Sequence, residues 1–169
     1  DRGGNTFHGL LDDTNEYLDG VLYCMNGEKK QGSFKEGQLT GPGKHTLSSG
    51  DIQEGEFSEG NLQGQGKVYY SSGDVYEGQF DRGLKDGEGE LWYSNGDHFQ
   101  GKFSKDSPKE GTMKYSDGNI FEGEFYKNNI GMRGKMKSKG DVLYEGDFFR
   151  GKKHGQGYEI IPDKETYCG

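Results

Sequence analysis

The sequence predicts an all-β protein: an elongated, twisted ribbon of stacked antiparallel β-hairpins, open like a solenoid, with one hairpin per repeat of about 23 residues. Only 28% of the 169 residues are hydrophobic, against roughly 45–50% in ordinary globular domains, so a large central core is not available. The chain nevertheless holds 32 Gly, 11 Tyr, 10 Phe and one Trp, and a disordered tail would not need so many aromatic rings. A fixed repeat accounts for both the low hydrophobic content and the many glycine and aromatic residues.

A glycine in a YEG-like element marks each repeat, and we call it the first-strand glycine. Successive first-strand glycines are 23 residues apart, with one spacing of 22, and such a period is typical of stacked supersecondary units. They are Gly9, Gly32, Gly55, Gly78, Gly101, Gly123, Gly146 and Gly169. We therefore interpret residues 1–169 as a single array, with units that begin near residues 7, 30, 53, 76, 99, 121 and 144 and a partial unit from 167.

Each unit contains two predicted strands. In YEGQF, Tyr76 and Phe80 stand two residues before and after Gly78, an alternation typical of a strand. A second-strand glycine follows eleven positions after the first, and large residues such as Leu91 and Tyr93 stand two and four positions beyond Gly89. Segments such as DRGLKDGE between the strands and SNGD between the units contain residues typical of turns. Each unit is therefore predicted to be one hairpin.

The two glycines of a unit are in phase with its aromatic residues. A missing side chain at these positions leaves space for a ring to lie against the backbone, which is one use of glycine within strands. An isolated hairpin is marginal in water, so we expect each hairpin to pack on its neighbours.

The segments YEGQFDRGLKDGEGELWYSNGD, YEGDFFRGKKHGQGYEIIPD and QEGEFSEGNLQGQGKVYYSSGD resemble the MORN repeat, the membrane occupation and recognition nexus motif. The resemblance covers essentially the whole chain, as seven repeats and the start of an eighth. The first unit, with LLDDTNEYLDG, lacks the middle glycines. The fifth is predicted to lack one residue of its hairpin loop, and the sixth to lack a loop glycine and to have a shortened second strand.

The sequence holds no constellation typical of an enzyme, and we expect no cofactor and no metal. The four histidines fall in different units, and no Ser or Cys stands with a His and a carboxylate in a suggestive arrangement. The Gly-x-Gly pairs precede strands rather than helices, which argues against phosphate loops. His154 is interpreted as a turn residue.

The two cysteines lie at opposite ends of the array. Cys24 is in the first unit and Cys168 in the last, so in a stacked ribbon they stand too far apart for a disulfide. Two unbridged thiols fit a reducing compartment, so we expect a cytoplasmic protein. The family resemblance implies association with the cytoskeleton or a membrane.

Positive charge gathers in residues 126–154, which hold eight Lys or Arg and three carboxylates, although the chain carries a net charge of −8. In RGKMKSK, the alternating Arg133, Lys135, Lys137 and Lys139 would share one strand face and form a candidate site for an acidic lipid. The alternative, which we favour, is that Glu145 and Asp147 of the next strand pair with them. The acidic remainder disfavours nucleic acid.

Exposed aromatic residues are the predicted protein-binding site. Tyr23, Tyr69 and Trp92 are out of phase with the core positions of their strands, and such rings are frequent anchors at interfaces. On the opposite face, Tyr76, Phe80, Phe99 and Phe103 form a second candidate groove, but for these residues we favour a structural role.

We therefore interpret the chain as a non-catalytic scaffold whose extended β-surface binds a peptide or helix of a protein partner. The family resemblance implies partners that are cytoskeletal or membrane-associated. It also leaves the alternative of a regulatory segment of an enzyme, such as a SET lysine methyltransferase or a lipid kinase, besides direct lipid binding. Open edge strands further predict end-to-end dimerisation.

Overall fold

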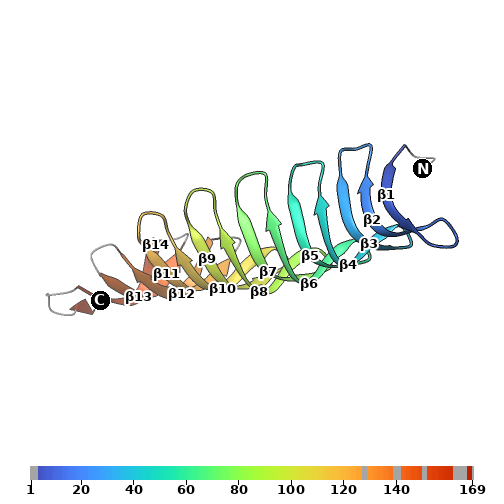
Figure 1. The fold of residues 1–169 in the computed structure, drawn as a ribbon. Coiled ribbons are helices and arrows are strands. Elements are labelled where there is room, and N and C mark those ends of the chain that lie inside the picture. Colours follow the sequence, from blue (N-terminus) through green and yellow to red (C-terminus); the bar gives the residue numbers. More distant parts are fainter. Residues whose placement is uncertain (1–3, 127–128, 139–141, 150–151, 162–166, 169) are drawn as a thin grey trace. The chain divides into compact units, whose positions relative to one another are not determined.

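The computed structural model describes residues 4–126, 129–138, 142–149, 152–161 and 167–168. The chain falls into two compact units: unit 1 is residues 1–85 and unit 2 is residues 86–169. In each unit the described residues form an antiparallel β-sheet whose strands follow one another in chain order (Figure 1). The sheets are open and twisted, which confirms the predicted fold class.

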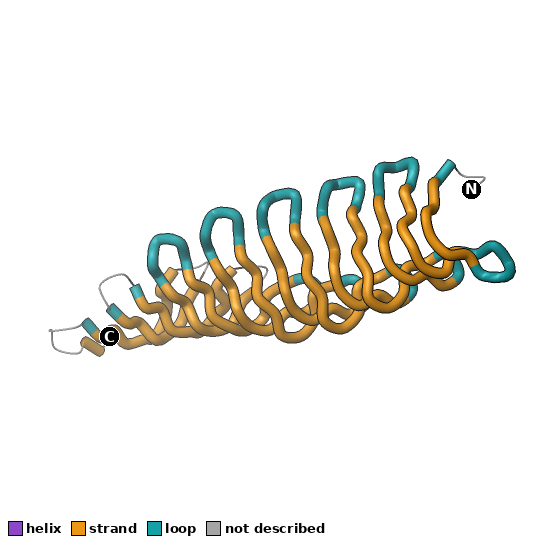
Figure 2. The backbone as a smooth tube through the Cα atoms, in the orientation of Figure 1, coloured by secondary structure: helices purple, strands orange, loops and turns teal. Residues whose placement is uncertain are grey.

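The strands of unit 1 are β1 (Thr6–Leu11), β2 (Tyr17–Tyr23), β3 (Lys29–Lys35), β4 (Gln38–Thr46), β5 (Ile52–Ser58), β6 (Asn61–Tyr69) and β7 (Val75–Asp81). Unit 2 contains most of β8 (Leu84–Trp92), then β9 (His98–Ser104), β10 (Ser107–Lys114), β11 (Ile120–Tyr126), β12 (Asn129–Lys137), β13 (Leu143–Phe149), β14 (Lys152–Ile160) and β15 (Tyr167–Cys168). Figure 2 shows the strands joined by short loops. The described part of the chain contains no helix of the length and apolarity needed to cross a membrane.

Two-residue loops join the strands of the central hairpins. Glu59 and Gly60, between β5 and β6, have φ angles of 49° and 76°, as the type I′ turn requires. Lys105 and Asp106, between β9 and β10, also both have positive φ angles, and here an aspartate stands in place of the glycine. Aspartate tolerates this conformation better than most residues, so the turn is kept without glycine.

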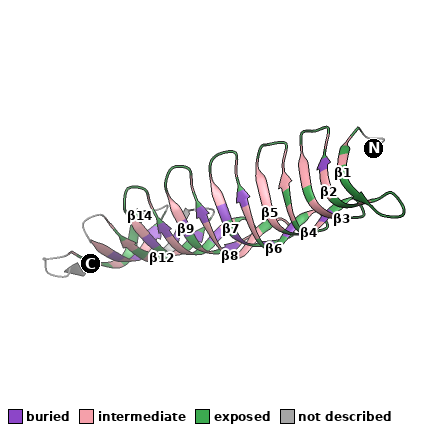
Figure 3. Cartoon of the chain, in the orientation of Figure 1, coloured by how far each residue is buried: buried purple, intermediate pink, exposed green. Residues whose placement is uncertain are grey.

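One face of each sheet carries the buried side chains, and Figure 3 shows buried and exposed positions alternating along the strands. The aromatic rings that flank the first-strand glycines meet edge to face: Phe99 lies 5.1 Å from Phe103 and 5.0 Å from Phe125, measured between ring centroids. Leu39 and Leu62, which the sequence pattern did not single out, are also fully buried. The rings and leucines form a thin apolar layer along each sheet in place of a central core.

The glycines of neighbouring strands stand opposite one another, as in the row Gly101, Gly111, Gly123 and Gly134 of unit 2. A Cβ built on Gly134 would lie 2.5 Å from Cζ of Phe121. The ring therefore occupies the space that a side chain would need, which confirms the role predicted for these glycines.

Two predictions about irregular units are wrong. The fifth unit does not lack a residue in its loop, because Lys105 and Asp106 form a loop as long as the others. The residue is missing instead from β10, which has eight residues. In the β5–β6 hairpin, residues 63–65 form a bulge opposite the single residue Glu56, whereas in the β9–β10 hairpin the bulge contains only Lys109. A bulge absorbs a deletion more easily than a two-residue turn does.

The second strand of the sixth unit is not shortened, because β12 has nine residues, as β6 and β8 have. The glycine that this unit lost belongs at residue 128, which lies outside the described residues.

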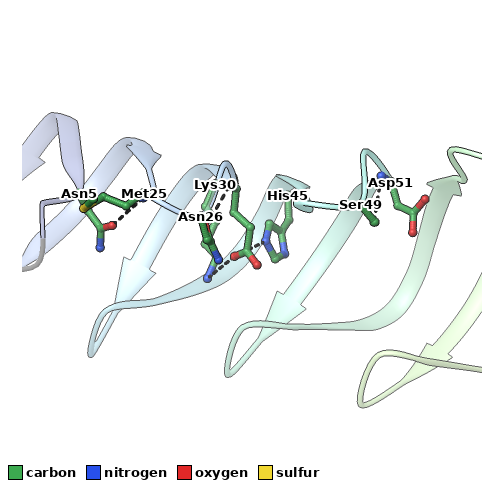
Figure 4. A network of polar contacts seen from close by, with 8 residues as sticks. Asn5, Met25, Asn26, Lys30, His45, Ser49 and Asp51 are labelled. Carbon is green, nitrogen blue, oxygen red and sulfur yellow. Dashed lines mark hydrogen bonds and ion pairs between the residues drawn. The ribbon is translucent and has the colours of Figure 1, made fainter.

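Side chains at the turns between hairpins bind backbone amides of the neighbouring turn. The Oδ1 atom of Asn5 accepts a hydrogen bond from the amide of Met25, 3.1 Å away, and Oδ1 of Asp51 accepts one from Ser71 at 2.7 Å. Figure 4 shows this polar edge of unit 1. The bond from Ser71 is the main reason why the pKa of Asp51 is below its usual value.

Candidate functional site

The face of the unit 2 sheet opposite the aromatic layer contains a groove of about 480 Å³. Its floor is the backbone of the glycine row, and charged residues on either side of each glycine form its two walls. The groove is lined by Glu88, Gly101, Lys102, Glu110, Gly111, Thr112, Glu122, Gly123, Glu124, Arg133, Gly134, Lys135 and Glu145. Residues two apart in a strand are about 6.6 Å apart, so the two walls run parallel on either side of the glycine row.

Strand register decides which charges meet along the groove. In one wall, Glu88 stands opposite Lys102, Lys102 opposite Glu110, and Glu110 opposite Glu124. Lys102 pairs with Glu110 at 3.8 Å, although both side chains are more than 60% exposed. In the other wall, Thr112, Glu122, Lys135 and Glu145 follow one another. The groove therefore carries more carboxylates than cations.

An aromatic ledge adjoins the groove on the same face. Glu88, Glu90 and Trp92 alternate along β8, so the Trp92 ring lies beyond the groove wall. The ring stacks on His98, with centroids 5.1 Å apart and planes 11° from parallel. His98 is held in turn by Glu90, 2.9 Å from its Nε2 atom. Trp92 thus keeps 38% of its surface exposed while its position is fixed by contacts beneath it.

The other exposed aromatic candidates lie in unit 1. Tyr69 is 38% exposed, stands opposite Ile52 and Val75, and has the Lys67 ammonium 5.5 Å from its ring centroid. Tyr23 is also exposed, near Lys29. Tyr23 and Tyr69 belong to unit 1, whereas Trp92 belongs to unit 2.

The second candidate group of the sequence analysis is buried. Tyr76 and Phe99 have no exposed surface, and Phe80 and Phe103 are at most 4% exposed. Their rings pack on each other within the aromatic layer. They therefore present no surface to a partner, and the structural role is the one that the packing supports.

The predicted pairing of the basic strand is confirmed for two of its residues. Lys135 Nζ lies 3.4 Å from a carboxylate oxygen of Glu145, and Arg133 Nε lies 4.0 Å from one of Asp147. Lys137 stands opposite Ile120 and Leu143, and Lys139 lies outside the described residues. No contact in the described structure points to a lipid, so the lipid site stays a prediction.

Glu145 belongs to a polar cluster at the end of the groove. The Tyr158 hydroxyl donates a hydrogen bond to Glu145, and this bond, followed by the charge of Lys135, places the pKa of Glu145 below its usual value. The same bond raises the pKa of Tyr158. Glu145 therefore stays ionised and remains bound to its neighbours.

Catalytic or metal-binding groups do not gather in the described part of the chain. His8, His45 and His98 lie in different hairpins, and the described residues include no cluster of three His, Cys, Asp or Glu that could hold a metal ion. Cys24 is a free, half-buried thiol.

The groove was not predicted from the sequence, although a pattern that indicates it is present. Glutamates flank the first-strand glycine in repeated EGE elements, such as Glu122-Gly123-Glu124, and such residues share the face opposite the rings. Alternation alone predicts that face, but not which charges lie opposite one another.

Comparison with known protein families gives one match. The model of the MORN repeat matches residues 31–52, 54–75, 76–98 and 144–166, which together are more than half of the chain. A search of curated proteins gave no significant match.

Among the solved structures that match the chain are two domains of Drosophila SAS-4, and the first of them resembles the chain in fold. One is the TCP domain of Drosophila melanogaster SAS-4 (dCPAP) in complex with a proline-rich motif of Ana2 (dSTIL), with 13% identity, a TM-score of 0.57, and coverage of 96% of this chain and 88% of that chain. The other is the TCP10c domain of Drosophila melanogaster Sas-4, with 13% identity, a TM-score of 0.45, and coverage of 96% and 97%.

Proposed function

Because this chain belongs to the MORN repeat family, we propose that it is a protein-interaction module that binds an extended segment of a partner on the open face of its sheet. The observation that carries the proposal is the Trp92 ledge beside the groove of unit 2: a large exposed ring, stacked on His98, next to a preformed trough. Trp is among the residues that most often dominate binding energy at interfaces.

The geometry favours binding with little reorganisation. Glu90 holds His98, and His98 supports Trp92, so the anchor loses little side-chain entropy when a partner covers it. The floor of the groove is the backbone of paired strands, which also stays in place. A partner side chain can pack on the indole while the rest of its segment follows the groove.

Work on the same fold supports a peptide ligand. The Drosophila SAS-4 domain was solved with a proline-rich motif of Ana2, so a sheet of this kind can hold a peptide. We further propose that the hairpins β1–β2, β9–β10 and β11–β12, which lie outside the four matched windows, are diverged MORN repeats, because they share the paired glycines. A cytoskeletal or membrane-associated partner, and a cytoplasmic location, remain predictions.

Selection from a peptide library displayed on phage tests the proposal. We expect the chain to enrich a common class of peptides, and Trp92→Ala to weaken their binding at least tenfold, since an aromatic hot spot is worth about 2 kcal/mol or more. Tyr126→Ala is the matched control, because Tyr126 is an exposed ring of the same unit, at the end of β11. Equal binding by Trp92→Ala and the unchanged chain would remove the ledge from the site, and enrichment of no peptide would contradict the proposed function itself.

A further inference from the structure

The strand β1 forms the outer edge of the unit 1 sheet, and this edge is apolar. Among the described residues, β1 pairs with β2 alone, so the other side of its backbone has no strand beside it (Figure 1). Leu10 and Leu11 of β1 are 65% and 47% exposed, and Leu18, in the bulge opposite them, is 49% exposed. Three exposed leucines therefore gather at one open edge.

Leu11 occupies a position that is buried in the other hairpins of unit 1. It stands two residues after the first-strand glycine, as Phe34 and Phe57 do, and those rings are at most 4% exposed. The two rings are covered because β3 and β5 have strands on both sides, whereas β1 has a described strand on one side. The apolar layer of unit 1 therefore extends to the sheet edge and ends there uncovered.

The strand β1 also lacks the charges that the other strands carry. Every strand from β2 to β14 contains at least one Lys, Arg, Asp or Glu, and β1 contains none. Next to the first-strand glycine, β5 has Glu54 and Glu56, whereas β1 has His8 and Leu10. Charged side chains are a usual means by which proteins prevent the addition of a strand to a sheet edge. The β1 edge is therefore not protected against another strand.

The register of the sheet predicts how a second β1 would pair with this edge. Each strand pair of unit 1, from β1–β2 to β6–β7, places a glycine opposite a glycine. Two antiparallel β1 strands in that register have Gly9 opposite Gly9, with a two-fold axis between them. Phe7 then stands opposite Leu11 of the second copy on the ring-bearing face, and His8 opposite Leu10 on the open face.

This self-pairing is favourable for β1 and unfavourable for a charged strand. Each exposed leucine of β1 receives an aromatic side chain as its opposite neighbour, and the two-fold axis makes each contact twice. The same arrangement of two β5 strands would place Glu54 opposite Glu56 of the second copy, where like charges repel. The β1 edge is therefore complementary to itself.

The backbone of β1 is oriented for such a pair. A Cβ built on Gly9 would lie 2.6 Å from Cα of Gly20, the close approach that is typical of opposed residues that exchange no hydrogen bonds. The N–H and C=O groups of Gly9 therefore point away from β2, towards the open edge. In the two-fold pair, the N–H of Gly9 in each copy can donate to the C=O of Gly9 in the other.

We infer that the β1 edge binds a second copy of this chain, through a two-fold antiparallel pair of β1 strands centred on Gly9. Open edges alone predict dimerisation without a location, and the exposure, the lack of charge and the register assign it to β1. The inference concerns unit 1 and does not rest on the proposed function, whose anchor Trp92 belongs to unit 2.

Sedimentation velocity of the whole chain over a range of concentrations tests the inference. We expect a monomer–dimer equilibrium with a dissociation constant of roughly 1–100 μM, because a pair of six-residue strands is a small interface. A chain that stays monomeric well above this range would show that no second copy covers the edge, and it would overturn the inference.

A lysine at the edge should prevent the pairing. Leu10→Lys should weaken dimerisation at least tenfold, because the ammonium group would have to leave water beside His8 of the second copy. Leu84→Lys is the matched control, since Leu84 is a 42% exposed leucine of unit 1 that does not belong to β1, and it should leave dimerisation unchanged. Circular dichroism shows that both variants are folded. Dimerisation that is equal in the two variants would place the interface elsewhere and contradict the inference.

Cysteine cross-linking tests the register. When His8→Cys and Leu10→Cys chains are mixed and oxidised, we expect a disulfide between position 8 of one copy and position 10 of the other, because opposed residues lie within disulfide reach. Neither variant alone should form a bond at its new position, since the two copies of that position lie diagonally, about 7–8 Å apart. Peptide mapping by mass spectrometry distinguishes this bond from any that involves Cys24 or Cys168. A cross-link in another register, or none, would overturn the inference.

The proposed function is separable in the same variants. Peptides that bind through Trp92 should bind the Leu10→Lys variant as they bind the unchanged chain. A dimer without peptide binding would support the β1 inference and contradict the proposed function, and peptide binding by a strict monomer would do the reverse.

Discussion

Replacement of Gly123 by alanine tests whether the glycine row determines the fold. Gly123 has a φ of 159°, a conformation that residues with a side chain rarely adopt. A Cβ there would lie 2.7 Å from the carbonyl oxygen of Arg133, 2.8 Å from the Cα of Gly134 and 2.9 Å from Cζ of Phe121. Two of these atoms belong to the paired strand, so they cannot move without breaking the ladder.

The expected cost has two parts. The unfavourable backbone conformation contributes about 1–3 kcal/mol, and the added methyl group in a packed position contributes about 1–3 kcal/mol more. We therefore expect Gly123→Ala to lower the free energy of unfolding by about 2–6 kcal/mol. The matched control is Gly118→Ala, at a turn with φ of 91° and no atom within 4 Å of the added Cβ, which tests the backbone part alone.

Urea denaturation provides the assay, because Trp92 is the single tryptophan and reports on β8 and β9 of the same unit. With a dependence on urea of about 2 kcal/mol/M, Gly123→Ala should lower the midpoint by about 1–3 M and Gly118→Ala by about half as much. Far-UV circular dichroism should follow the same transition. Equal midpoints for the two variants would refute the argument that the glycine row makes room for rings.

Three further outcomes follow from buried and polar contacts. Phe99→Ala should cost about 3–5 kcal/mol, measured by circular dichroism, because it empties a site with no exposed surface; a loss below about 1 kcal/mol would contradict this. Asp97→Ala should cost about 1–2 kcal/mol, since Oδ1 accepts a bond from the Ser116 amide at 2.8 Å, whereas Asp97→Asn keeps the acceptor and should cost less. This bond places the pKa of Asp97 below its usual value. The bond therefore stabilises the fold at pH values above the usual pKa of aspartate, and this stabilisation is lost as pH falls through the pKa of Asp97 in the folded protein. Acid denaturation of the alanine variant identical to that of the unchanged chain would contradict this argument. His45 stands where the neighbouring hairpins have Leu22 and Val68, and burial lowers its pKa although Glu28 lies 3.2 Å away. Stability should therefore decline as pH falls below about 6.5. His45→Leu should reduce that decline in thermal melts from pH 8 to 5.

Local pattern was sufficient to predict the hairpins and the ring-bearing face. Tyr76 and Phe80 alternate around Gly78, and both are buried on one face as predicted. Such features depend on residues close together in the chain, because alternation and turn chemistry act within a single strand or loop.

Register and burial across strands depended on the tertiary structure. Alternation places Glu110 and Glu124 on the open face, but only the pairing of β10 with β11 places them opposite each other. Sequence spacing shows only the number of residues between the two glycines of a unit. It therefore predicts the loop as the place of the deletion in the fifth unit, whereas in the structure a bulge in β10 absorbs it.

The sequence by itself determined the repeat, the hairpin and the layer of rings, since each depends on residue type and short spacing. The tertiary structure alone decided that Trp92 rests on His98 and that Glu110 stands opposite Glu124 in a groove. The physical reason is that these relations join residues on different strands, where a shift of one residue in register would change every neighbour.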